Sequence, residues 1–243
     1  MRSYVTTSWD DGGEFDLRLA DRLRKHGVSG TFYWTVDSER FVMPSHETAE
    51  EILAFGMEIG SHTMTHPDVT AIEPDILRWE LEESKTRLEA FTGREVSSFC
   101  YPFGYFDDRS AAAVAAAGYR LARTAMGFRN DVGPDPFKMP VTIHMYQHGR
   151  RVHLTHALKE RNTVGLGRWL TAYKAGADLV ALTQAALDEM ETKGGVLHLW
   201  GHSWELEEFG LWGALDDVLD VIAERPNLTH LTNGELSSSI AAG

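Results

Sequence analysis

The chain has few of the features that tie a protein to an oxidising compartment, a membrane or a nucleic acid. Cys100 is its only cysteine, which excludes an intrachain disulfide. No apolar run approaches the roughly 20 residues of a bilayer span, and no secretory signal precedes the first predicted strand. With 36 acidic and 23 basic side chains the net charge is -13, which argues against nucleic acid and anionic membrane as main partners. We therefore expect a soluble, cytoplasmic protein, whose oligomeric state the sequence does not indicate.

Several catalytic motifs are also missing. There is no Gly-x-Ser-x-Gly nucleophile elbow and no phosphate-binding loop, and Gly165-Leu166-Gly167 lacks the third glycine of a dinucleotide fingerprint. Cys100 has no obvious neighbouring base and is only a weak candidate nucleophile. The catalytic schemes that depend on these motifs therefore fit the sequence poorly.

Strand and helix patterns alternate along the chain. Strands are predicted at 4–9, 29–35, 57–61, 96–101, 119–124, 195–201 and 228–232, and helices at about 17–26, 47–55, 74–91, 109–117, 178–190 and 206–223. Between about 126 and 167 the periodicity weakens and three prolines interrupt it, although 139–145 fits a short strand. Alternation of this kind predicts an α/β fold with a parallel sheet, and about seven strands favour a barrel within a single domain, 1–243.

Two motifs with metal-binding side chains each follow a predicted buried strand. The first is the acidic pair Asp10-Asp11, and the second is His62 and His66, four residues apart. On a helical turn this spacing would point both rings at one ion. Alone, Asp-Asp-Gly is typical of a surface turn and paired histidines also occur by accident, but the carboxyl ends of parallel strands are where α/β folds carry functional residues. We therefore predict an open site for zinc or a related divalent metal, as in metallohydrolases.

Further candidates follow later strands. His198 lies in the predicted strand at 195–201 and His202 directly follows it, and strand alternation places both on the same face. Because His202 is nearer the carboxyl end, it is the better candidate for a site residue. His198 fits a buried core histidine better. Aromatic residues near these strand ends could stack on sugars, although most are expected in the core. Four further histidines could form a second metal site, but solvent-facing positions or local structural roles are the expected interpretation: His144, His148, His153 and His156.

Four segments resemble, in order, the motifs of the polysaccharide deacetylases, carbohydrate esterase family four with its NodB homology domain. They are Ser8–Gly12, Ser61–His66, Tyr101–Gly104 and the late His202. The resemblance implies a distorted or incomplete (β/α) barrel. It also implies a set of roles: Asp11, His62 and His66 as metal ligands, Asp10 as the general base for a metal-activated water, the backbone N–H of Phe103 as oxyanion donor, and His202 as general acid.

The chain departs from the family pattern at two positions. Cys100 stands where the family usually has an arginine that orients the base, and Phe103 replaces a tyrosine. A backbone donor does not need the tyrosine side chain, but the base needs a cation. We expect Arg123, at the end of the next strand, to hold Asp10 ionised; the alternative is an arginine that extends to solvent.

The function expected from these residues is hydrolysis of a linear carbon–nitrogen amide, with an N-acetylated sugar or glycan as substrate. Zn²⁺ is the expected metal, with Co²⁺, Ni²⁺ and Fe²⁺ as alternatives. A small-molecule amidohydrolase acting on ureide-like compounds would use the same groups. An inactive, metal-containing carbohydrate-binding protein is a third possibility, but it would have no need of Asp10 beside Asp11.

Overall fold

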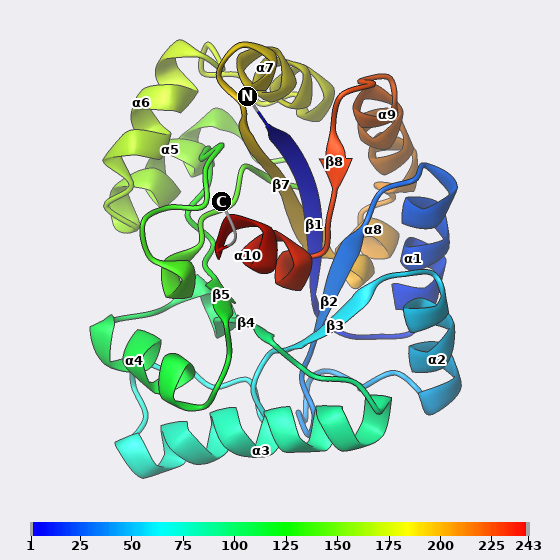
Figure 1. Ribbon diagram of the computed structural model, residues 1–243. Helices are drawn as coiled ribbons and strands as arrows, with labels where there is room; N and C mark the ends of the chain where they lie inside the picture. The colour runs from blue at the N-terminus through cyan, green and yellow to red at the C-terminus, as the bar shows by residue number, and fades with distance from the viewer. Residues whose placement is uncertain (1, 242–243) are drawn as a thin grey trace.

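The computed structural model describes residues 2–241 and shows a curled parallel sheet with helices around it (Figure 1). The strand order is β5-β4-β3-β2-β1-β7-β6, with β8 paired to β1 outside this path, and every ladder is parallel. The strands are β1 (Ser3–Asp11), β2 (Gly30–Trp34), β3 (Glu58–Ser61), β4 (Ser98–Cys100), β5 (Leu121–Arg123), β6 (Ile143–His144), β7 (Gly195–His202) and β8 (Thr229–His230). This arrangement confirms the predicted α/β fold and distorted barrel.

The barrel is incomplete between β5 and β6. Within residues 2–241 no ladder joins these two strands, and only an isolated bridge links Arg123 to Met139. Three prolines surround the bridge, at 134, 136 and 140, and proline cannot donate to a ladder. A continuous strand therefore does not form at this edge.

Ten α-helices and two short 3₁₀ turns cover the sheet in the part of the chain that is described. They are α1 (Asp16–Lys25), α2 (His46–Ala54), α3 (Pro74–Thr92), η1 (Pro102–Gly104), α4 (Asp108–Ala116), η2 (Pro136–Lys138), α5 (Arg150–Lys159), α6 (Thr163–Thr171), α7 (Leu179–Lys193), α8 (Ser203–Glu208), α9 (Trp212–Ala223) and α10 (Asn233–Ala241). The helix predicted at 74–91 is confirmed as α3: it is amphipathic, with Leu77, Leu81 and Leu88 buried, and Gly93 ends it with a φ of 63°.

Three sequence predictions need correction. The helix expected over 206–223 is two helices, α8 and α9, and Gly210 in a left-handed conformation lies between them. The region of weak periodicity contains α5 and α6, whose apolar side chains are largely exposed and so give no one-sided pattern. The last helix, α10, was not predicted.

The strands β1 and β7 are the two longest of the sheet and pair along most of their length, and their carboxyl ends carry part of the site. Close packing here depends on Gly201 of β7, because a Cβ at that position would stand 3.2 Å from the buried ring of Trp9 on β1. Asp10 is the register partner of His202 across the same pair of strands. None of the described helices combines the length and apolar character needed to cross a bilayer.

Candidate active site

The acidic pair ends β1 in a strained turn. Asp11 has a φ of 77°, in the left-handed region that non-glycine residues seldom occupy, and Gly12 and Gly13 follow with positive φ as well. Asp10 and Asp11 are 4% and 3% exposed. Both carboxylates are therefore held in the interior at the strand end, where burying them requires charged partners or a metal.

The two histidines are brought together by a loop, so the expectation of a helical turn is wrong. Residues 62–66 have no helical assignment, and Thr63 and His66 are left-handed, with φ of 70° and 63°. A buried carboxylate from α3 supports this backbone: Glu80 accepts hydrogen bonds from the N–H groups of Met64 and Thr65, at 2.8 and 3.0 Å. The loop replaces its missing helical hydrogen bonds with bonds to Glu80.

Asp11, His62 and His66 form a group whose ligand atoms fit a divalent metal. Asp11 Oδ1 stands 3.6 Å from His62 Nε2 and 3.4 Å from His66 Nε2. Ligands about 2.1 Å from a tetrahedral zinc ion lie roughly 3.4 Å from one another, so these separations match such a site. Two imidazoles and one carboxylate also leave a coordination position for a water or substrate oxygen.

The protonation states of His62 and Asp11 are also those that metal binding requires. Burial lowers the pKa of His62 to about 4, which keeps the ring neutral, and its Nδ1 bonds the Cys100 carbonyl oxygen at 2.8 Å. With Nδ1 as the donor, the Nε2 lone pair faces Asp11. Burial would raise the pKa of Asp11, but hydrogen bonding to His66 and the nearby His202 and His62 lower it overall. Asp11 is therefore an ionised ligand.

Asp10 pairs with Arg123, the residue proposed from the sequence as its cation. Arg123 is only 1% exposed and its guanidinium forms an ion pair with Asp10 Oδ1. It reaches Asp10 from β5, where it is the register partner of Cys100 on β4. The Arg123 guanidinium is therefore supplied by β5, the strand next to β4, where the family pattern places its arginine at position 100.

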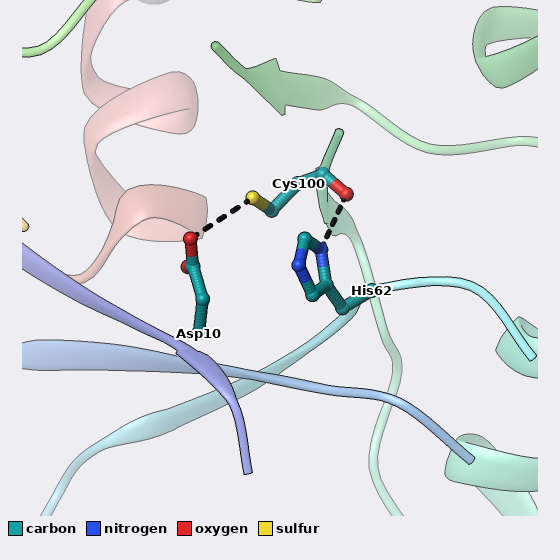
Figure 2. A group of neighbouring side chains, drawn as sticks. All are labelled: Asp10, His62 and Cys100. Carbon is teal, nitrogen blue, oxygen red and sulfur yellow. Dashed lines mark hydrogen bonds between the residues drawn. The ribbon is translucent and has the colours of Figure 1, made fainter. Parts of the chain in front are cut away.

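Cys100 itself contacts both Asp10 and His62, as Figure 2 shows. Its Sγ approaches Asp10 Oδ2 at 3.6 Å, and its carbonyl oxygen bonds His62. Burial raises the pKa of this thiol well above its usual range, so it stays protonated. A buried, protonated thiol of this kind is not a nucleophile.

The charge balance around Asp10 keeps it ionised. Burial would raise its pKa, but Arg123, His62 and His202 outweigh that effect and lower the pKa to about 2. The Arg123 guanidinium also packs over the Trp200 ring, 4.8 Å from its centroid. Asp10 is therefore present as a carboxylate at neutral pH.

His202, at the end of β7, faces the ligand group from the strand that pairs with β1. Its Nε2 is 3.8 Å from Asp11 Oδ2, and its Nδ1 bonds Glu205 Oε2 at 2.5 Å. Burial lowers the pKa of His202, but Glu205, Asp10 and Asp11 raise it above its usual 6.5 overall. His144 bonds the same Glu205 oxygen at 3.1 Å. These contacts favour a protonated His202 with a fixed ring orientation.

His198 lies deeper and does not join this group. Its Nε2 bonds Ser8 Oγ at 2.8 Å, and burial lowers its pKa to about 3. It is a neutral core histidine, as its sequence position suggested.

Phe103 is the last of the predicted site residues. It has a left-handed φ of 60°, follows Pro102 in η1, and its ring packs edge-on against His66 with 4.6 Å between centroids. Its side chain is half exposed, so this residue lies at the mouth of the site beside a metal-ligand candidate.

Three residues of the site were missed in the sequence. Glu80 bonds the backbone of the histidine loop, Glu205 bonds His202, and Trp204, one of the aromatic residues near the strand ends, donates a hydrogen bond to Asp11 Oδ2 at 3.0 Å. The i to i+3 spacing of His202 and Glu205 could have indicated their pairing. Nothing in the sequence indicates that Glu80 bonds to a loop.

Two hollows in the surface are lined by residues that neighbour the ligand group. One, of about 650 Å³, is lined by Phe103, His144 and Trp200 together with α5 residues. The other, of about 780 Å³, is lined by Gly12, Trp204 and the loop from Arg40 to Ser45. Phe103 of the first hollow packs against His66, and Trp204 of the second bonds Asp11, so both hollows connect to the ligand group through a contacting residue.

Comparison with known proteins supports the reading of these motifs. Residues 2–122 match the polysaccharide deacetylase family model. An uncharacterised 30.6 kDa protein of Geobacillus stearothermophilus is 28% identical over 127 residues, 51% of this chain and 47% of that protein. The peptidoglycan-N-acetylmuramic acid deacetylase PdaA of Bacillus subtilis is 25% identical over 176 residues, 70% of this chain and 66% of that protein. The chain thus spans about half to two thirds of these relatives.

A solved structure extends the fold comparison to the whole chain. A Mycobacterium smegmatis protein assigned to the polysaccharide deacetylases has a TM-score of 0.67 and 16% identity, covering 100% of this chain and 92% of that one. At this identity the likeness concerns the fold. The matched segment, residues 2–122, contains Asp10, Asp11, His62 and His66, and it places this chain in the polysaccharide deacetylase family.

Proposed function

We propose that this protein hydrolyses the N-acetyl amide of a sugar or glycan. The observation that carries this proposal is the convergence of three groups at one end of the sheet: the ligand group Asp11–His62–His66, the Asp10–Arg123 pair, and the His202–Glu205 pair. An amide needs help both at its weakly electrophilic carbonyl and at its poor leaving group, and the residues here can act at both ends.

Asp11, His62 and His66 would hold the divalent metal, and we propose Zn²⁺ because two imidazoles and a carboxylate are ligands that it accepts. When bound, such a metal makes water more acidic and polarises the carbonyl. Co²⁺, Ni²⁺ and Fe²⁺ are compatible with the same donors.

The remaining steps belong to the protein's own groups. Asp10, kept ionised by Arg123, accepts the proton of the attacking water. The N–H of Phe103 donates to the oxyanion that develops on the carbonyl. His202, kept protonated by Glu205, delivers a proton to the departing nitrogen, which leaves as an amine.

The shape of the site favours sugar units over a small ureide. A single small molecule would need only one hollow, whereas two hollows here adjoin residues that contact the ligand group, one lined by Phe103 and the other by Trp204. Aromatic rings in such positions can stack on sugar faces. We therefore place the acetylated sugar over the metal ligands, with neighbouring units in the two hollows.

The test is a substrate panel on the Zn²⁺-loaded protein. Acetate release should be measured from N-acetylglucosamine oligomers, acetylated peptidoglycan fragments and cyclic ureides, beside Asp10→Asn and a control variant, Arg120→Ala. We expect release from the acetylated sugars, a loss of about a hundredfold or more in Asp10→Asn, and no change in the control. Turnover of ureides alone would support the small-molecule amidohydrolase, and oligosaccharide binding without any release would support an inactive binding protein.

A further inference from the structure

Helices α5 and α6 carry apolar side chains that no part of the fold covers. The two helices lie together on the outer side of the molecule, away from α1, α2 and α9 (Figure 1). Large aliphatic side chains on them are exposed, from 37% for Val152 to 61% for Leu158: Val152, Leu154, Leu158, Val164 and Leu170. An exposed group of this kind indicates an interaction surface.

The segment that forms these two helices has a net positive charge, opposite in sign to that of the whole chain. Residues 149–174 contain six lysines and arginines and one acidic residue, Glu160, whereas the whole chain is strongly acidic. Burial raises the pKa of Glu160 to about 7, which reduces its charge at neutral pH. Most of the basic side chains form no ion pair with any residue between 2 and 241: Arg150, Arg151, Lys159, Arg161 and Lys174.

The basic and apolar side chains share one face of α5. Arg151, Leu154 and Leu158 are spaced three and four residues apart and therefore project from the same side of the helix, and all three are exposed. Other residues of α5, including His153 and Ala157, line the hollow beside the active site. The helix thus separates that hollow from a surface that is both cationic and aliphatic.

We propose that the α5–α6 surface docks on an anionic lipid bilayer, at its interface and without a spanning helix. Aliphatic side chains inserted among headgroups, with arginine and lysine beside them, are the pattern of interfacial membrane binding. A protein partner fits less well, because leucine and valine are under-represented among protein-interface hot spots and this segment exposes no tryptophan or tyrosine.

The net charge of -13 does not prevent such docking. At physiological ionic strength charges are screened over about 8 Å, so the bilayer responds to the nearest face of the protein and not to its total charge. The net charge calculated from the sequence argued against an anionic membrane because it sums acidic and basic residues that lie on different faces of the folded protein.

The test is co-sedimentation of the full chain with vesicles of phosphatidylcholine alone or of phosphatidylcholine and phosphatidylglycerol in equal parts. We expect binding to the anionic vesicles only, weakened by salt. Leu154→Ser with Leu158→Ser, and separately Arg150→Glu with Arg151→Glu, should each weaken binding about tenfold or more. The matched control variants are Ile76→Ser and Arg78→Glu, at exposed positions of α3, and they should bind like the parent chain.

Unchanged thermal midpoints would show that all variants are folded. Equal binding to both vesicle types, or no effect of either double substitution, would overturn the proposal. So would a dimer, detected by light scattering, that the same double substitutions dissociate, because the surface would then be an interface between copies of this chain. None of these readouts depends on catalysis, so they test the surface separately from the proposed hydrolysis.

Discussion

A single residue, Arg123, explains how Asp10 stays ionised without the arginine that the family pattern places at position 100. Arg123 is the register partner of Cys100 on the adjacent strand, and its side chain crosses to Asp10 inside the barrel. Compared with the family pattern, the arginine is on β5 instead of β4, and it still forms an ion pair with the Asp10 carboxylate. A thiol is small enough to leave room for this path.

Replacing Arg123 with alanine should therefore impair proton transfer without removing the metal ligands. We expect Arg123→Ala to lower kcat about a hundredfold while bound zinc, measured by atomic absorption, stays near that of the parent. Arg120→Ala, at an exposed arginine paired with Glu95 just before the same strand, provides the control. Normal turnover in Arg123→Ala would rule out this role.

At the scale of elements, the loop after β3 depends on α3. The backbone of Thr63 and His66 is left-handed, which costs free energy in non-glycine residues, and the buried Glu80 supplies the compensating hydrogen bonds. Helix α3 therefore does more than cover the sheet, because it fixes one metal-ligand candidate through the loop backbone.

Loss of the Glu80 carboxylate should loosen this loop. We expect Glu80→Ala to weaken zinc affinity about 10- to 100-fold, as is typical of residues that orient metal ligands. Competition with a chromophoric chelator would measure the change. Glu82→Ala, an exposed glutamate of the same helix, should bind zinc like the parent; an equal loss in both variants would attribute the effect to the helix as a whole.

The start of α1 holds a second buried acid. Asp16 Oδ2 accepts a hydrogen bond from Trp34 Nε1 at 2.8 Å and Oδ1 from Ser203 Oγ at 2.5 Å, and burial raises its pKa from 3.8 to about 7. The folded protein thus keeps a proton that the unfolded chain releases. The stability contributed by Asp16 is fully present below about pH 4 and is lost as the pH rises through about 7.

Asp16→Asn should flatten this pH dependence. In metal-free protein we expect the free energy of unfolding of the parent to fall by roughly 2 kcal/mol more than that of the variant between about pH 5 and pH 8. Urea denaturation at a series of pH values measures this difference. Asp21→Asn, an exposed acid of the same helix, should follow the parent, and parallel curves for parent and Asp16→Asn would contradict the raised pKa.

At the scale of the whole molecule, the incomplete barrel brings together the ends of β1, β3, β4, β5 and β7. Asp11 comes from β1, while His62 and His66 follow β3. A metal held by these residues would link two parts of the chain that are separated by α1, β2 and α2. Metal binding should therefore stabilise the fold as a whole.

We expect zinc at about 100 times its Kd to stabilise the protein by about 2.7 kcal/mol, which raises Tm by roughly 5–10 °C for a chain of this size. Chelation should reverse the shift in differential scanning fluorimetry. The double variant His62→Ala, His66→Ala should lose it, whereas His46→Ala, at an exposed histidine, should keep it. A full shift in the double variant would place the stabilising metal elsewhere.

Most helices and strands could be predicted from the sequence, but several contacts of the site could not. Alternating strands and helices were recognisable because burial on a sheet imposes local periodicity, and α3 was located from its apolar spacing and its terminal Pro74 and Gly93. The helices α5 and α6 were not located, because their exposed apolar residues obscure the period. The break at Gly210 was missed because one glycine in a helical pattern is ambiguous.

The sequence by itself determined the composition of the site, since its motifs place two carboxylates and two imidazoles directly after strands, and parallel strands share one functional edge. Only the tertiary structure decided which distant groups support them. Arg123 lies 113 residues from Asp10, the hydrogen bonds from Glu80 depend on a loop conformation, and the α5–α6 surface appears as cationic and apolar only once the chain is folded. Contacts across the sheet depend on strand order and register, which local patterns of residues do not encode.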